Sequence, residues 1–358
     1  MYKKSAVTLE YASKNLAVTQ ERYLMNLLRS NADCYYGKIN GFNTTRSVNE
    51  FQKKVPVTSY EDYFPLLERI MDGEKNILTN QEISRFAMTS GTASDHKLIP
   101  YTKKLIKEFY SALGPWMHYN YGRYNELCRG TSFWVITPAG DLPEIKSKVP
   151  VRFDEDSYYF GRLTGKILKR VMVLPDAVSR ISDIENYYYV AAYFLISSSA
   201  LRLISVWNPY LLTILCDKIK KYRKELISDV KEGSIHPPSR LSEPESRLLI
   251  PYIKARPKQA ARLMEVFTRF QSDDRLLWAE LWPNLSLISC WTDGWAGDFL
   301  PQIRQLFPGV PVQGKGLLAT EAIISIPFTK GDPVLAATSH FYEFIGLERG
   351  DVLLAHQL

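Results

Sequence analysis

The sequence of 358 residues contains only four cysteines, and none of them belongs to a CxxC pair. The four thiols, Cys34, Cys128, Cys216 and Cys290, are widely separated along the chain. This spacing argues against a structural zinc site and against a disulfide framework. Scattered, unpaired cysteines are typical of proteins in a reducing compartment, so we expect a cytoplasmic protein.

Long hydrophobic runs are also missing. The first residues lack the continuous apolar stretch of a secretory signal. The least charged region extends from Asn186 to Cys216, where Arg202 is the one charged residue. The uncharged runs on either side of Arg202 are shorter than the ~20 apolar residues that a membrane helix needs. We therefore expect a buried helix, a buried strand at 201–207 and a second helix after Pro209.

The charge balance shows no strong excess of either sign. Lys and Arg number 45 against 38 Asp and Glu, which gives a formal net charge of +7 at pH 7. The chain has no basic tail and no recognisable nucleic-acid-binding motif. A modest positive charge suits an anionic small molecule, and we expect neither nucleic acid nor a membrane as a partner.

Several catalytic motifs with a known mechanism are absent. The sequence contains no GxxxxGK[ST], HExxH, GxSxG or GxGxxG. These absences argue against a Walker-type nucleotide site, a zinc protease, an α/β-hydrolase and a dinucleotide-binding fold.

The sequence does contain an alternation of strand-like and helical segments. This alternation predicts an α/β fold in which mostly parallel sheets are sandwiched between helices. A single core stops growing at about 250–300 residues. We therefore expect two interleaved α/β subdomains, roughly 60–215 and 260–358, together with a helical N-terminus.

Local signals carry further expectations. Thr102 is predicted to cap a long amphipathic helix, and Ser59 is predicted to cap an earlier one. Residues 216–230 are predicted to continue the helix that follows Pro209. Residues 233–258 are rich in proline, serine and charge and are predicted to form an insertion or a connecting loop. Residues 333–347 are predicted to form a strand pair or one extended strand.

The most informative segment is MTSGTASDHKLIP, residues 88–100, which separates two strand-like runs. Thr89, Ser90, Gly91 and Thr92 offer hydroxyls and backbone N–H groups that bind phosphate oxygens, and Lys97 can neutralise their charge. Gly91 permits a close approach of the backbone. Taken alone, this composition fits an ordinary turn equally well.

The segment resembles the phosphate loop of acyl-adenylate-forming enzymes, and its continuation Lys97–Pro100 resembles one branch of them. This branch is the family of acyl acid amido synthetases, known from auxin-responsive plant proteins and their bacterial relatives. Two further motifs are similar to that family: LLATEA at 317–322 and FYEFIGL at 341–347. The resemblance covers nearly the whole chain in order.

The resemblance implies a role for individual residues. Thr89, Ser90, Gly91 and Thr92 would hold the phosphates of ATP, with Lys97 beside them. Gly294 would lie on the adenine side of the pocket, and Leu318, Ala319 and Thr320 would form a wall of it. Glu321 would bind Mg²⁺ or orient the phosphates, so Glu321 and Lys97 are the expected catalytic residues. The acyl group is expected near Tyr187, Tyr188 and the strand after Gly294.

The resemblance also implies an enzyme, an AMP-forming ligase. It would adenylate a small carboxylic acid with ATP and then conjugate the acyl group to an amine or amino acid as an amide. Family members continue into a C-terminal lobe that these 358 residues lack, so we expect a fragment. One alternative is an acyl- or aryl-CoA ligase. The other is a non-catalytic acid-binding relative, favoured by Ala93, Ser94 and Asp95, which depart from the phosphate-loop pattern.

Overall fold

The computed structural model describes most of the chain. The described residues are 2–89, 96–135, 145–152, 171–270, 272–328, 332–348 and 350–358. The expected phosphate-loop residues Ser90, Gly91 and Thr92 lie outside these ranges, as do Ala93, Ser94 and Asp95.

A four-stranded parallel sheet forms the centre of the fold. Its strands are β3 (Thr131–Trp134), β5 (Leu201–Ser205), β6 (Leu287–Cys290) and β7 (Val312–Gly314), in the order β3-β5-β6-β7. All neighbouring strands in it are parallel. The four residues of β6 are all buried, as the apolar runs of a parallel sheet require. The expected α/β fold is confirmed.

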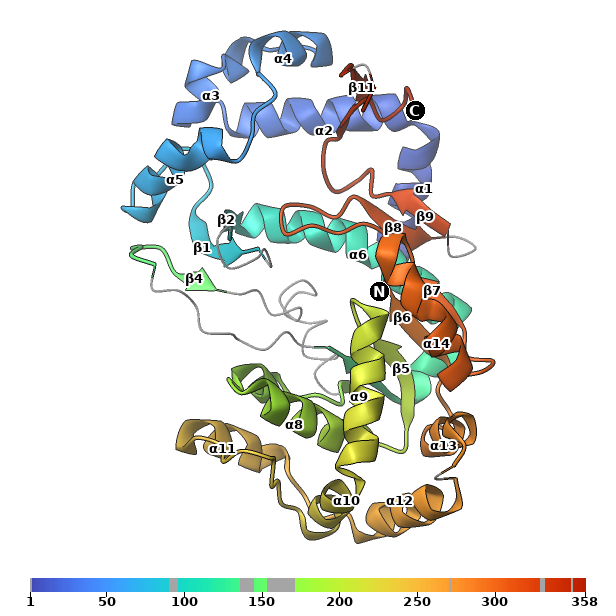
Figure 1. Cartoon of the computed structure of the whole chain (residues 1–358). Helices are drawn as coiled ribbons and strands as arrows, with labels where there is room; N and C mark the ends of the chain where they lie inside the picture. Colours follow the sequence, from blue (N-terminus) through green and yellow to red (C-terminus); the bar gives the residue numbers. More distant parts are fainter. Residues whose placement is uncertain are drawn as a thin grey trace.

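Side chains that alternate along these strands supply two separate cores. Phe133, Ile204 and Ile288 lie in register on one face. They pack into a core with helices of residues 184–307. Trp134 and Leu287 face the other core, which contains residues of α6 (Lys103–Arg123). The helices of the first core are α8 (Ile184–Ile196), α9 (Pro209–Lys221), α10 (Arg223–Glu232), α11 (Glu243–Leu249), α12 (Pro257–Arg269), α13 (Asp274–Leu281) and α14 (Leu300–Leu306). Figure 1 shows α9 next to β5.

The predicted long helix is α6 (Lys103–Arg123). As expected, Thr102 caps it, because its side chain accepts a hydrogen bond from the Leu105 N–H at 3.0 Å. The predicted helix, strand and helix between residues 186 and 216 are also confirmed as α8, β5 and α9. In the part of the chain that the structure describes, no helix has the length and apolarity needed to cross a membrane.

The prediction of one continuous helix after Pro209 is wrong. α9 ends at Lys221, and α10 begins after Tyr222, whose backbone leaves the helical conformation. The Tyr222 ring packs edge-on against Tyr189 of α8. The turn allows Leu226 and Val230 of α10 to be buried in the same core. Tertiary packing therefore outweighs the local helical pattern here.

The segment 233–258 is more ordered than its composition indicated. It contains α11 (Glu243–Leu249), whose first turn is fixed by a capping box between Ser242 and Glu245. Ser59 also differs from its prediction. Its N–H and hydroxyl donate to Asp62, and the turn that follows is a short 3₁₀ helix, Glu61–Tyr63.

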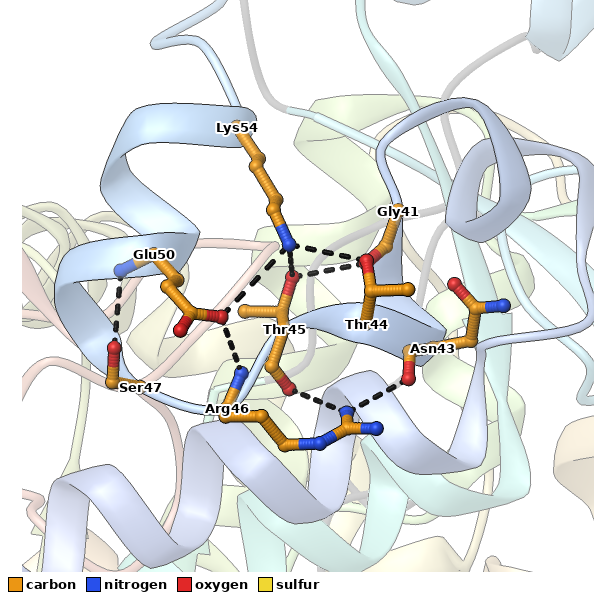
Figure 2. A network of polar contacts seen from close by, with 8 residues as sticks. All are labelled: Gly41, Asn43, Thr44, Thr45, Arg46, Ser47, Glu50 and Lys54. Atoms are coloured by element: carbon orange, nitrogen blue, oxygen red, sulfur yellow. Dashed lines mark hydrogen bonds and ion pairs between the residues drawn. The ribbon is translucent and has the colours of Figure 1, made fainter.

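Helices form the N-terminal region. They are α1 (Lys3–Lys14), α2 (Leu16–Ser30), α3 (Tyr35–Ile39), α4 (Val48–Lys54) and α5 (Phe64–Met71). Polar contacts fix the entry to α4 (Figure 2). Lys54 donates to the hydroxyls of Thr44 and Thr45, and Glu50 accepts from the Arg46 N–H at 2.9 Å. Ser47 caps the helix at the Glu50 N–H.

Gln20 of α2 connects this N-terminal region to the segment that follows β9 (Asp332–Leu335). Its side-chain amide donates to the carbonyls of Ala337 and His340 and accepts from the Tyr342 N–H. Gln20 is itself buried. The amide therefore satisfies three backbone groups that would otherwise be buried without partners.

The described residues also form three smaller sheets. β1 (Ile83–Met88) lies between β2 (Leu98–Thr102), its antiparallel partner, and β4 (Val151–Arg152), its parallel partner. The segment 333–347 contributes to two different sheets rather than to one pair or strand. β9 (Asp332–Leu335) pairs with β8 (Ser325–Phe328), and β10 (Glu343–Ile345) pairs with β11 (Val352–Leu354). The division into subdomains 60–215 and 260–358 remains a prediction.

The partly buried His340 predicts a pH-dependent stability. Burial lowers the pKa of His340 to about 4, and its Nε2 has no hydrogen-bond partner among the described residues. The unfolded chain takes up this proton near pH 6.5, whereas the folded chain does not until about pH 4. Stability is therefore lost as the pH falls through this window, by about 2 kcal/mol between pH 7.5 and pH 5.

Urea unfolding at both pH values measures this loss. The His340→Gln variant, which cannot take up the proton, should lose about 2 kcal/mol less stability than the parent over the same interval. An equal loss in both proteins would contradict the assignment.

Candidate functional site

The candidate site lies where the parallel strands end. β3, β5, β6 and β7 all point their C-terminal ends toward the same edge of the sheet. In open α/β sheets, ligands bind in the crevice outside the carboxyl ends of the strands. The segments that follow these strands are therefore the expected location of a ligand-binding site.

The predicted motif 317–322 forms the arm and tip of a narrow hairpin. Leu318 and Ile323 pair as an antiparallel bridge, and the Ala319 N–H donates to the Ala322 carbonyl at 2.8 Å. Thr320 and Glu321 therefore lie at the tip of this hairpin, which we call the 318–323 hairpin. Glu321 is exposed there.

A buried tyrosine connects this tip to the sheet of β1 and β2. The Tyr101 hydroxyl donates to the Thr320 carbonyl at 2.6 Å, and Tyr101 is fully buried. Tyr101 belongs to β2, the strand that follows the predicted phosphate loop. The two motifs, more than 200 residues apart, are thereby held together.

The base of the predicted phosphate loop is closed by hydrogen bonds. The Lys97 N–H donates to the Thr89 hydroxyl at 3.0 Å, and the Thr89 N–H donates to the Lys97 carbonyl at 3.0 Å. The Lys97 ammonium lies 5.2 Å from the ring centroid of Tyr60. The Tyr60 hydroxyl accepts from the Leu98 N–H at 2.6 Å.

The negative charge of Glu321 acts on the same tyrosine whose ring lies beside the Lys97 ammonium. Burial raises the pKa of Tyr60, and the negative charges of Glu321 and Glu61 add to the rise. A hydrogen bond to its own backbone N–H lowers the pKa of Glu61, and the charge of Lys97 contributes to the lowering. Thr89, Lys97, Thr320 and Glu321 are thus gathered by Tyr60 and Tyr101, which the sequence analysis did not single out.

Gly294 lies at the same edge of the sheet. It follows β6 and begins a 3₁₀ helix, Gly294–Phe299, with a φ of 59° in the left-handed region that favours glycine. Among the described residues, none comes within 4 Å of the position that a Cβ would occupy there. The structure therefore leaves open space beside Gly294.

An apolar cavity lies on the inner side of the 318–323 hairpin, between α6 and the strand ends. Its volume is about 30 Å³, room for two or three water molecules. Leu318, expected to wall the nucleotide, lines this cavity. Tyr187 and Tyr188 are not part of its lining, and Tyr187 belongs to the core on the other face. The lining residues are Leu113, Trp116, Trp134, Val135, Ser205, Val206, Trp207, Lys315, Leu318, Ile323 and Ile326.

Lys315 is the one charged residue in this described lining. The positive charge of Lys315 acts on the thiol of Cys290, the last residue of the neighbouring strand β6. Burial raises the pKa of the Cys290 thiol to about 11, and the positive charge of Lys315 opposes that rise.

Comparison with known proteins gives a consistent result. The family model "GH3 family N-terminal domain" matches residues 6–312. The chain is 22% identical, over 95% of its length, to a probable indole-3-acetic acid-amido synthetase of Oryza sativa subsp. japonica. It is 25% identical, over 89% of its length, to an indole-3-acetic acid-amido synthetase of Arabidopsis thaliana. It spans only 57% and 54% of these two relatives.

Solved structures share the fold. An acyl acid amido synthetase matches 97% of the chain with a TM-score of 0.77 and 19% identity. A structure of such an enzyme in complex with 2,4-DB matches 99% of the chain with a TM-score of 0.82. The chain covers 61% and 62% of these two proteins. At 19% identity, the similarity to these solved structures shows that the chain has the same fold.

The hydrogen bond from Tyr101 to Thr320 predicts a local effect. Tyr101→Phe leaves the Thr320 carbonyl without its partner, which should cost about 1–2 kcal/mol of stability. Amide hydrogen exchange at residues 319–322 should become faster. Tyr189→Phe is the matched control, because this buried hydroxyl donates to Asp229 at 2.7 Å in the other core. Equal exchange at 319–322 in both variants would contradict the role of Tyr101.

Proposed function

The chain belongs to the GH3 family, and from this premise we propose that it carries the acid-activating part of an ATP-dependent acyl acid amido synthetase. The observation that supports the proposal most directly is the meeting of two distant motifs, Thr89 with Lys97 and Thr320 with Glu321, through Tyr60 and Tyr101. The names of the relatives favour an amide product over a thioester.

The proposed reaction has two steps. The carboxylate of a small acid attacks the α-phosphorus of ATP, which forms an acyl-adenylate and releases pyrophosphate. An amine, such as that of an amino acid, then attacks the acyl carbon and displaces AMP to form the amide. The substrate carboxylate is itself the nucleophile, so the protein contributes mainly positioning and charge stabilisation.

Each member of the site has a place in this scheme. We propose that Thr89, Ser90, Gly91 and Thr92 bind the ATP phosphates and that Lys97 neutralises part of their charge. The backbone of Leu318, Ala319 and Thr320 would form one wall of the nucleotide site, and Gly294 would leave room for adenine.

Glu321 suits a magnesium ion bound mainly by the nucleotide. Among the described residues, no group of three or more His, Cys, Asp or Glu side chains is arranged to hold a metal. Mg²⁺ characteristically takes one or two protein carboxylates, with substrate phosphates and water as its other ligands. A single exposed carboxylate at the tip of the 318–323 hairpin fits that demand. When bound, the ion would neutralise phosphate charge.

We further propose that the acid binds beside the 318–323 hairpin, on the side where Leu318 and Ile323 present apolar surface, in place of the region near Tyr187 and Tyr188. A cytoplasmic location is also proposed, because all four cysteines are free thiols.

Binding of Mg·ATP to this chain, measured by calorimetry, tests the nucleotide site. Glu321→Ala should weaken binding about tenfold or more by removing a charged ligand. The thermal midpoint should stay unchanged because Glu321 is exposed. Glu82→Ala, at another exposed carboxylate, is the control. A folded parent that does not bind Mg·ATP, or equal affinity in parent and Glu321→Ala, would contradict the proposal.

A further inference from the structure

Tyr60 lies outside the two motifs of the candidate site, yet it contacts one of them directly. It precedes the 3₁₀ helix Glu61–Tyr63 and so belongs to the helical N-terminal region. Its side chain packs against the hydrophobic clusters on both faces of the β1–β2 pair. It also meets Phe64 edge-on, with the ring centroids 5.2 Å apart. These contacts hold the ring in one place.

The hydroxyl of Tyr60 covers the outer edge of β2. β2 is an edge strand of its sheet, and such strands leave backbone groups without a strand partner. The Tyr60 hydroxyl accepts from the Leu98 N–H at 2.6 Å and donates to the Leu98 carbonyl at 3.3 Å. Tyr60 is thereby attached to the backbone directly beside Lys97.

The ring of Tyr60 meets the side chain of Lys97. The ammonium lies 5.2 Å from the ring centroid, within the distance at which an aromatic face attracts a cation. The backbone of Lys97 is fixed as well, because its N–H and its carbonyl both bond to Thr89. With both ends held, this long side chain loses much of its rotamer freedom.

A carboxylate near Lys97 does not form an ion pair with it. A hydrogen bond to its own backbone N–H lowers the pKa of Glu61, and the charge of Lys97 adds to the lowering. The ion pairs among the described residues nevertheless do not include Lys97. The ammonium lies against a neutral ring instead.

A ring and a carboxylate are different partners for a cation that must meet an anion. An ion pair with a carboxylate would have to be broken, and the carboxylate would then repel the phosphate. The quadrupole of an aromatic ring attracts the ammonium without cancelling its charge. A side chain that is already oriented also loses less entropy when the ligand binds.

Resting on the proposed acid-activating function, we propose that Tyr60 is a positioning residue for Lys97. Its ring holds the ammonium, fully charged, at the base of the phosphate loop before the nucleotide binds. Its hydroxyl fixes the ring to β2. The helical N-terminal region thereby contributes to a site whose motifs lie elsewhere in the chain.

A double-mutant cycle in Mg·ATP binding, measured by calorimetry, tests this role. Tyr60→Leu should weaken binding about fivefold, whereas Tyr60→Phe, which keeps the ring, should stay within about twofold of the parent. Lys97→Met should weaken binding about tenfold or more. Adding Tyr60→Leu to Lys97→Met should change the affinity by less than about twofold, because Tyr60 acts through Lys97.

Tyr35→Leu is the matched control. The Arg69 guanidinium lies 4.4 Å from the ring centroid of Tyr35 in the same N-terminal region. This variant removes the same kind of contact from a different cation, so the affinity for Mg·ATP should not change. If Tyr60→Leu does not fold, Tyr60→Met takes its place with the same expectations, because methionine also removes the ring.

A measurement without nucleotide reports on the contact itself. In protein with ¹³C-dimethylated lysines, the ring current of Tyr60 should separate the methyl resonance of Lys97 from those of exposed lysines. The signal is assigned by its loss in Lys97→Met. The separation should disappear in Tyr60→Leu and persist in Tyr60→Phe.

The role of Tyr60 alone is refuted if the parent binds Mg·ATP and any one of these results is found: equal affinity in Tyr60→Leu, an equal loss in Tyr60→Phe or Tyr35→Leu, a further fivefold loss on adding Tyr60→Leu to Lys97→Met, or a Lys97 resonance unchanged in Tyr60→Leu. A folded parent that does not bind Mg·ATP would overturn the acid-activating function, and the role of Tyr60 with it.

Discussion

Both faces of the central parallel sheet are covered, and this double burial constrains most of the structure. Successive residues of each strand must be accommodated in two different cores, so Phe133 and Trp134 pack against separate sets of helices. Groups that must meet a ligand are gathered instead in the segments beyond the strand ends, where backbone groups are free to meet it. The 318–323 hairpin, Gly294 and Lys315 all lie in these segments.

The 318–323 hairpin divides the candidate site into two environments. Its tip is polar and exposed, with Glu321 near Tyr60, whereas its base is apolar and lines the cavity. A reaction between an acid and ATP needs such a division, because the acyl body and the phosphates have opposite solvation requirements. The antiparallel bridge between Leu318 and Ile323 maintains the separation.

The sequence predicted features with local causes more successfully than those with distant ones. The Thr102 cap of α6 and the strand of residues 201–205 depend on neighbouring residues, and both could be recognised. The turn at Tyr222 depends on packing against Tyr189, far away in the sequence, and it was missed. The capping box of Ser242 and Glu245 was a readable signal that the surrounding prolines and charges obscured. At the candidate site, the motif residues could be named in advance, but Tyr60 and Tyr101 could not, because their partners come from separate elements.

Gln20 has a consequence for how the chain folds during synthesis. Its partners Ala337 and His340 follow it by 317 and 320 residues. At the roughly 5–20 residues per second at which chains are made, the interval between Gln20 and Ala337 is on the order of 15–60 s. The N-terminal helices therefore emerge long before the segment that completes their buried contacts. Closure of the loop between Gln20 and Ala337 is therefore a late event in folding. Until then α2 must remain able to form these hydrogen bonds, while the central sheet forms from the residues between them.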